Sequence, residues 1–162
     1  MSRDGANVAA IETRTGSADE TEALGRRLGE RTAPGDLIAL IGPLGAGKTQ
    51  LVRGIALGAG TGDARDISSP TFVLLNQYAA PRFAIHHLDA YRLEHPRELA
   101  ALGFEELCES GGLVLVEWAD RVRVLIPDSA AWIRLTPTGA TERQVRLEGA
   151  AEIVQRFAPA FA

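Results

Sequence analysis

The chain has 162 residues, of which 46% are hydrophobic and 23% are charged. That length and that apolar fraction favour one domain, residues 1–162, around a single core, with residues 1–7 as a flexible tail. The formal net charge of −4 excludes a global positive field that would draw the protein to nucleic acid. The single cysteine, Cys108, excludes an internal disulfide and a zinc site built from cysteines, and we expect it to be buried in a helix.

Membrane and secretory features are not found in the sequence. The first residues lack the apolar core of a secretory signal. No apolar stretch approaches the ~20 residues that span a bilayer. We therefore expect a cytoplasmic protein with no membrane partner.

The first half of the chain predicts two strands and two helices. Residues 8–11 favour a short strand, and Ser17 and Glu20 have the spacing of a capping box that starts a helix. Residues 36–41 indicate a buried strand, and residues 50–57 continue a helix after a glycine-rich loop.

The second half alternates between hairpins and single elements. Antiparallel hairpins are expected at residues 71–78 with 82–88 and at 131–135 with 142–147, helices at 96–107 and 150–157, and a fully apolar strand at 113–116. The alternation of strands and helices predicts a three-layer α/β domain of the P-loop NTPase type, with a mixed, mainly parallel central sheet flanked by helices.

The sequence GPLGAGKT at residues 42–49, here called the glycine loop, fits the Walker A pattern G-x-x-x-x-G-K-[ST]. It lies between an apolar strand and a helix, as phosphate binding requires. Glycines let successive amides point at phosphate oxygens, and the helix start adds its positive dipole end. The expected nucleotide contacts are Gly42, Leu44, Gly45, Ala46, Gly47, Lys48, Thr49 and Gln50.

ATP is favoured as the nucleotide. The N-K-x-D and D-x-x-G motifs that are usual in guanine-specific switch proteins do not occur, since neither Asn7 nor Asn76 is followed by lysine. Lys48 is expected to reach the β- and γ-phosphates, and the Thr49 hydroxyl to coordinate Mg²⁺.

Hydrolysis also needs acids, and two apolar strands end in one. Asp89 follows residues 83–88, and Glu117 follows residues 113–116. We expect both to be catalytic, with Glu117 holding the magnesium ion. His86 and His87 point to opposite faces of their strand and should not share a metal, and His87 is expected to orient Asp89.

A hydroxyl-rich segment, Ser69-Pro70-Thr71, lies between the loop and the first of these acids. Because proline restricts its own backbone and that of the preceding residue, the segment has a preset shape. It is either an ordinary turn before a strand or a sensor of the γ-phosphate.

Five motifs in this order resemble those of the TsaE family, the bacterial ATPases of tRNA threonylcarbamoyladenosine synthesis. The resemblance runs from about Thr21 to Arg143. The motifs are G-x-L-G-A-G-K-T at residues 42–49, S-P-T-F at 69–72, H-x-D-x-Y-R at 87–92, E-W at 117–118 and I-P-D at 126–128.

The resemblance implies hydrolysis of ATP in support of a transferase complex formed with TsaB and TsaD, with tRNA bound only through that complex. It implies a base contact around Thr21, a first switch at residues 69–71, and a second switch next to Trp118. Tyr91 and Arg92 belong to the motif around the second acid, and we place them with the switch and partner contacts.

Two positions depart from the family pattern. Pro43 stands where aspartate is common, and Gln50 where threonine is frequent. Because neither position supplies a phosphate-facing side chain in the Walker pattern, ATPase activity should survive.

Two other functions are alternatives to a TsaE-like ATPase. One is a nucleotide sensor that does not hydrolyse ATP, and the other is a small-molecule kinase, which usually has an arginine-rich lid.

Overall fold

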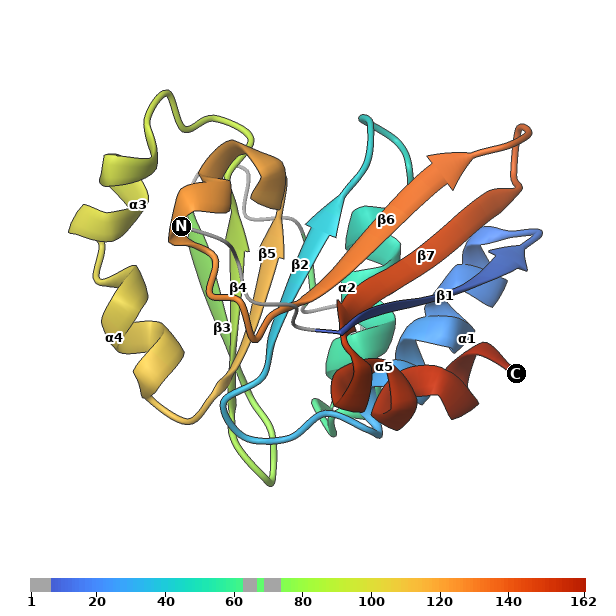
Figure 1. Cartoon of the computed structure of the whole chain (residues 1–162), viewed down its shortest axis with the longest axis horizontal. Helices are drawn as coiled ribbons and strands as arrows, with labels where there is room; N and C mark the ends of the chain where they lie inside the picture. Colours follow the sequence, from blue (N-terminus) through green and yellow to red (C-terminus); the bar gives the residue numbers. More distant parts are fainter. Residues whose placement is uncertain (1–6, 63–66, 69–73) are drawn as a thin grey trace.

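A seven-stranded mixed sheet forms the middle layer of the molecule (Figure 1). The structure, a computed structural model, describes residues 7–62, 67–68 and 74–162. The strand order is β1-β7-β6-β2-β5-β4-β3; the neighbouring strands β6, β2, β5 and β4 pair in parallel, and the outer pairings are antiparallel. The strands are β1 (Val8–Thr15), β2 (Leu37–Ile41), β3 (Leu75–Ala79), β4 (Ala84–Asp89), β5 (Leu113–Glu117), β6 (Ala131–Pro137) and β7 (Arg143–Ala150).

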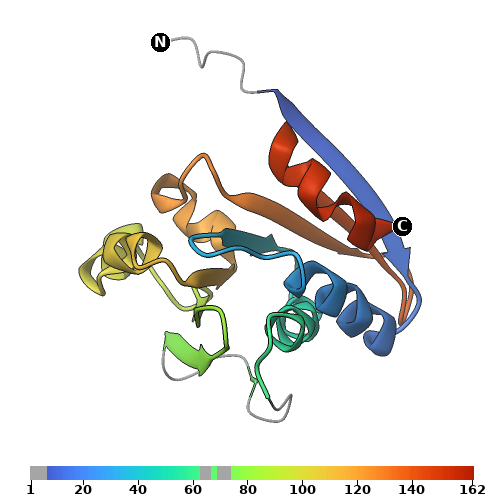
Figure 2. The ribbon, with the colours of Figure 1, turned by 90° about the horizontal axis from the view of Figure 1, so that it is seen from below.

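Helices cover both faces of the sheet, which confirms the three-layer α/β architecture. In Figure 2, α1 and α2 lie side by side on one side of β2, and η2 lies on the other. Helices α3 and α4 pack on the η2 side, whereas α5 packs on β1 and β7. The helices are α1 (Ala18–Gly29), α2 (Lys48–Gly58), α3 (Pro96–Ala101), α4 (Phe104–Glu109), η2 (Ala119–Leu125), α5 (Ala151–Phe157) and η3 (Ala158–Phe161).

The central strands β2 and β5 are buried on both faces. Every residue of both strands is buried, and alternate side chains enter different cores. Ile38 and Leu115 pack with α1 and α2, whereas Ala39 and Val116 pack with η2 and α3. This is why their sequences are continuous apolar runs rather than alternating ones.

Strands β6 and β7 alternate because a helical layer covers only one of their faces. Ile133 and Leu147 enter the core beneath α1, while Arg134 and Arg146 on the opposite face are exposed. The hairpin expected from the sequence is confirmed, with longer strands on both sides.

Glycines bring α1 and α2 unusually close. A Cβ atom on Gly25 would lie 2.5 Å from the Leu51 carbonyl oxygen, and one on Gly54 would lie 2.1 Å from the Glu22 oxygen. Gly25 weakens α1 as an isolated helix, and Gly54 does the same for α2. Because neither residue has a Cβ atom, the two helices can contact each other here. This contact sets α1 beside the glycine loop.

Other boundaries also differ from the sequence expectation. Strand β1 runs to Thr15 because it pairs along its whole length with β7. The helix expected at residues 96–107 is two helices, divided by Gly103, whose φ of +84° breaks the regular backbone. Asn7, placed with the tail, accepts a hydrogen bond from the Ala151 amide, so this residue is tied to α5.

The capping box holds at the start of α1. The Ser17 hydroxyl accepts from the Glu20 amide, and the Glu20 carboxylate accepts from the Gly16 amide rather than from that of Ser17.

Cys108 lies half-buried on α4, where burial raises the pKa of its thiol to about 11. Within the described ranges, no helix is both long enough and apolar enough to cross a bilayer.

Candidate nucleotide-binding site

The glycine loop connects the buried end of β2 to the start of α2. All three of its glycines have positive φ, and Gly47, at +98°, caps α2. Lys48 is the first residue of α2 and Thr49 the second. The loop thus has the strand–loop–helix setting that directs backbone amides and a helix dipole at an anion.

Both candidate acids lie at the same edge of the sheet as the loop. Asp89 ends β4 and Glu117 ends β5, and the register pairs these two residues with each other. Glu117 is also paired with Leu40 of β2, one residue before the strand ends. Ligands of open α/β sheets bind at this carboxyl edge, where neighbouring connections diverge.

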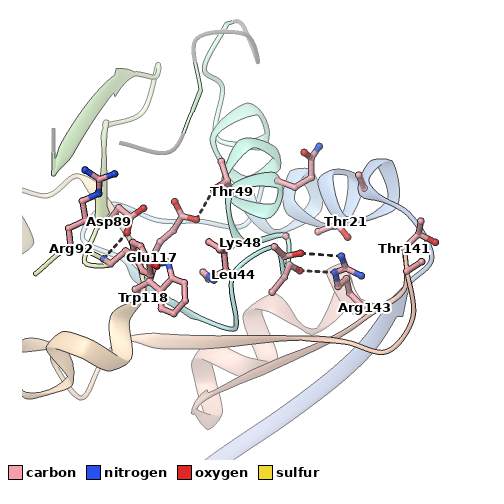
Figure 3. Close-up of a pocket in the computed structure, with 17 residues that line it drawn as sticks. Thr21, Leu44, Lys48, Thr49, Asp89, Arg92, Glu117, Trp118, Thr141 and Arg143 are labelled. Carbon is pink, nitrogen blue, oxygen red and sulfur yellow. Dashed lines mark hydrogen bonds between the residues drawn. The ribbon is translucent and has the colours of Figure 1, made fainter. Parts of the chain in front are cut away.

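Glu117 is held by two side chains. Its Oε1 atom accepts a 2.9 Å hydrogen bond from the Thr49 hydroxyl, and its Oε2 atom lies 2.7 Å from His87 Nε2 (Figure 3 shows the Thr49 bond). Glu117 is 2% exposed and His87 fully buried, so the carboxylate has a fixed orientation. This corrects the expectation for His87, whose ring contacts the Glu117 carboxylate rather than that of Asp89.

Tyr78 extends this chain of contacts towards the segment that precedes β3. Its hydroxyl lies 3.4 Å from His87 Nδ1 and 3.4 Å from the Ser68 carbonyl oxygen. Burial raises the pKa of the Tyr78 hydroxyl. The expected switch residues Ser69, Pro70 and Thr71 follow directly and lie outside the described residues.

Lys48 is buried rather than solvent-facing. Its Nζ atom donates to the carbonyl oxygens of Gly42 and, at 2.9 Å, Pro43, so it bridges the start of its own loop. The same atom lies 4.0 Å from the centroid of the Trp118 ring. Burial lowers the pKa of the Lys48 ammonium, and the nearby Glu117 and Asp89 carboxylates oppose this shift.

Trp118 has an unusual backbone. Its φ of +55° is rare for a bulky residue and marks local strain. The strained turn directs the ring back over the glycine loop, where the tilted Tyr91 ring packs against it at 4.8 Å between ring centroids. The Arg121 guanidinium lies over both rings, at 5.1 Å from Tyr91 and 5.5 Å from Trp118.

Asp89 and Thr21 make local contacts that shape the two ends of the site. Asp89 Oδ1 accepts from the Tyr91 amide at 2.8 Å, which fixes the turn after β4. Thr21 is 2% exposed and pairs with the Thr15 hydroxyl at 2.8 Å. Gln50 donates to Glu22 at 2.8 Å, joining α2 to α1.

A cleft of about 580 Å³ joins these residues. It brings together every expected site residue within the described ranges except Gly42, whose carbonyl lies beneath Lys48. Sequence reasoning missed three residues of the β6–β7 turn region, Ala140, Thr141 and Arg143, because no local pattern marks them. The lining residues are Ala18, Thr21, Leu44, Gly45, Ala46, Gly47, Lys48, Thr49, Gln50, Asp89, Tyr91, Arg92, Glu117, Trp118, Ala140, Thr141 and Arg143.

Comparison with known proteins identifies the family of this chain. The model of the family described as "Threonylcarbamoyl adenosine biosynthesis protein TsaE" matches residues 15–145. This chain belongs to the TsaE family. The matched span includes the glycine loop, both acids and the β6–β7 turn.

Individual TsaE proteins are also similar to this chain in sequence. The Rickettsia conorii protein is 43% identical over 110 residues, which cover 68% of this chain and 62% of that protein. The Bacillus subtilis protein is 34% identical over 135 residues, 83% of each chain. Both are named tRNA threonylcarbamoyladenosine biosynthesis protein TsaE.

A solved structure supports the fold over nearly the whole chain. The crystal structure of Bacillus subtilis YdiB superimposes with a TM-score of 0.76 at 27% identity and covers 95% of both chains. The expected TsaE resemblance and the P-loop-like α/β fold are therefore confirmed.

The adjacent histidines His86 and His87 on β4 have separate neighbours. His86 contacts Gln77 at 3.0 Å and lies 3.5 Å from the Ser110 hydroxyl, and burial lowers its pKa. His87 contacts Glu117. Over the residues that the structure describes, no group of three or more histidines, cysteines, aspartates or glutamates could hold a metal.

Proposed function

We propose that this protein binds ATP with Mg²⁺ in the cleft and hydrolyses it in support of threonylcarbamoyl modification of adenosine in tRNA. The observation that carries the proposal is the Thr49–Glu117 hydrogen bond at the start of α2. It joins the hydroxyl and the acid that phosphate-loop ATPases use to hold magnesium.

The donor set fits magnesium better than a transition metal. A hydroxyl and a carboxylate supply oxygen ligands, and Mg²⁺ commonly takes one or two such protein ligands with phosphate oxygens and water. Thr49 and Glu117 would hold the ion, which neutralises charge on the phosphates. Lys48 would bind the β- and γ-phosphates, and Asp89 would orient the attacking water.

Partners are proposed to complete the catalytic site. In phosphate-loop enzymes, an arginine supplied in trans accelerates hydrolysis by about 10³–10⁵-fold. We propose that TsaB and TsaD act here, either by supplying such a group or by ordering the cleft around ATP. The protein alone should then be a weak ATPase.

The cluster of Tyr91, Trp118 and Arg121 is the proposed partner contact. Aromatic and arginine side chains are enriched among residues that dominate interface energy. Tyr91 lines the cleft and is 42% exposed, so a partner that covers it would lie next to the nucleotide. We place this assembly in the cytoplasm, with tRNA bound through the complex because the free chain is acidic.

The test is phosphate release from ATP by the purified protein, alone and with TsaB and TsaD. We expect slow turnover alone and strong stimulation by the partners, both abolished by Lys48→Ala. ATP binding without turnover under either condition would favour the sensor alternative instead.

Arg121→Ala tests the partner contact separately. It should reduce stimulation while leaving ATP binding unchanged, because Arg121 does not line the cleft. Arg123→Ala is the matched control, since Arg123 lies on the same helix and stacks on Trp132, at 4.3 Å. Equal losses in both variants would reject the assignment.

A further inference from the structure

Arg143 joins the glycine loop to a turn almost 100 residues further along the chain. Its Nε atom donates to the Ala46 carbonyl oxygen at 3.0 Å, and Nη2 donates to the Gly45 carbonyl oxygen at 3.1 Å. Its Nη1 atom donates to Gly139 at 3.2 Å and Glu142 at 2.8 Å. One guanidinium thus bridges two backbone segments through four carbonyl groups.

A second contact holds the start of the loop against the same hairpin. A Cβ atom on Gly42 would lie 2.6 Å from the carbonyl oxygen of Leu135, so the loop backbone is packed directly on β6. The loop is therefore anchored to the hairpin at its first residue by packing and at its middle by Arg143.

The Arg143 bonds fix the orientation of two peptide groups. In a trans peptide the C=O and N–H groups point in opposite directions. When Arg143 holds the Gly45 and Ala46 carbonyls, the amides of Ala46 and Gly47 must point away from it. The Ala46 amide donates to Pro43, which closes the loop, and the Gly47 amide belongs to the start of α2.

We propose that Arg143 is a positioning residue for nucleotide binding: by holding the carbonyls of Gly45 and Ala46, it keeps the glycine loop in its closed shape and turns the Gly47 amide towards the phosphates. This inference rests on the proposed ATP site. Arginine suits the task because its planar guanidinium presents donors in a rigid fork, which a lysine cannot reproduce.

Substitutions at Arg143 distinguish the effect of its geometry from the effect of its charge. If Arg143 acted on the phosphates through its charge alone, lysine at this position would preserve binding. If Arg143 acted only by stabilising the fold, its loss would lower the melting temperature and leave affinity unchanged. Positioning predicts instead that both alanine and lysine weaken nucleotide binding in a folded protein.

The test measures the Kd for Mg-ATP and the melting temperature of wild type, Arg143→Ala, Arg143→Lys and Arg146→Ala. Arg146 is a matched control because it lies on the same strand and bonds to Glu12 and Glu148 on the open face of the sheet. We expect both Arg143 variants to lose about tenfold in affinity, or about 1.4 kcal/mol, and Arg146→Ala to match wild type.

Three results would overturn the inference. They are restored affinity in Arg143→Lys, unchanged affinity in Arg143→Ala despite a lower melting temperature, and an equal loss in Arg146→Ala. If Arg143→Ala does not fold, the lysine variant decides. A wild-type protein that binds no ATP would instead refute the proposed function, and this inference with it.

Discussion

The Lys48 ammonium lies 4.0 Å from the centroid of the Trp118 ring and donates to two carbonyl groups of its own loop. A phosphate that takes this ammonium must draw it away from the ring or compete with the loop carbonyls. The environment of the Trp118 ring therefore depends on the position of Lys48, the lysine that the proposed ATP site requires.

We predict that ATP changes the fluorescence of Trp118. The only other tryptophan is Trp132 of β6, which lies against Arg123. Its fluorescence is removed by making the measurement in a Trp132→Phe variant. Lys48→Ala should lose the response and weaken ATP binding on the order of a hundredfold, because hydrogen bonds from charged groups contribute about 1.5–3 kcal/mol each. A normal response in a folded Lys48→Ala protein would contradict the Walker A assignment.

Glu117→Gln and Asp89→Asn should fail in different ways. Glu117 is buried against Thr49, so its amide variant should weaken ATP binding that depends on magnesium. Asp89 holds the turn that carries Tyr91, and its amide variant should bind Mg-ATP but hydrolyse it slowly. Kd and turnover are measured for both variants, and the opposite pattern would mean that the two roles are exchanged.

His87→Ala should raise the magnesium concentration needed for half-maximal ATP binding. Removing a residue that orients a metal ligand typically costs about 10–100-fold in metal affinity. His86→Ala is the matched control, because His86 is the adjacent residue, is nearly as buried, and contacts Gln77 instead of Glu117. Identical magnesium dependence in the two variants would show that His87 does not act through Glu117.

Gly54→Ala should destabilise the protein although alanine is the better helix former. Its Cβ would lie 2.1 Å from the Glu22 carbonyl oxygen, so α1 and α2 must separate. Overpacking of this kind costs about 1–3 kcal/mol, or more where backbone must move, against about 1 kcal/mol gained in helix propensity. Thermal unfolding measures the change. Gly149→Ala is the control, since a Cβ atom on Gly149 would lie 3.4 Å from its nearest neighbour, the Ala130 carbonyl oxygen. A Gly54→Ala protein that is more stable than wild type would refute the close packing of α1 and α2.

Cys108 should react slowly with alkylating reagents at pH 8. Burial, followed by the charges of Glu109 and Glu105, raises the pKa of the thiol from 9.0 to about 11. Two pKa units reduce the reactive thiolate fraction about a hundredfold relative to the unfolded chain. Because the native state binds this proton more tightly, the thiol should also lower the free energy of unfolding as pH rises from 9 towards 11. Equal alkylation rates in native buffer and in urea would contradict the shift.

The sequence alone determined the parts of this protein that depend on local pattern. The continuous apolar runs of β2 and β5 predict strands buried on both faces, and the glycine loop between β2 and α2 predicts a phosphate site. The two acids at strand ends could also be placed near the loop, because parallel strands end at one edge of a sheet.

The tertiary structure decided the contacts that join distant segments. The sequence did not show that His87 would meet Glu117, since that contact depends on the pairing of β4 with β5. It did not show why α1 tolerates Gly25, because the reason is the approach of α2. Arg143 carries no local signal at all: it lies 97 residues from Ala46, and only the return of β7 beside the glycine loop gives its guanidinium those carbonyls to bind.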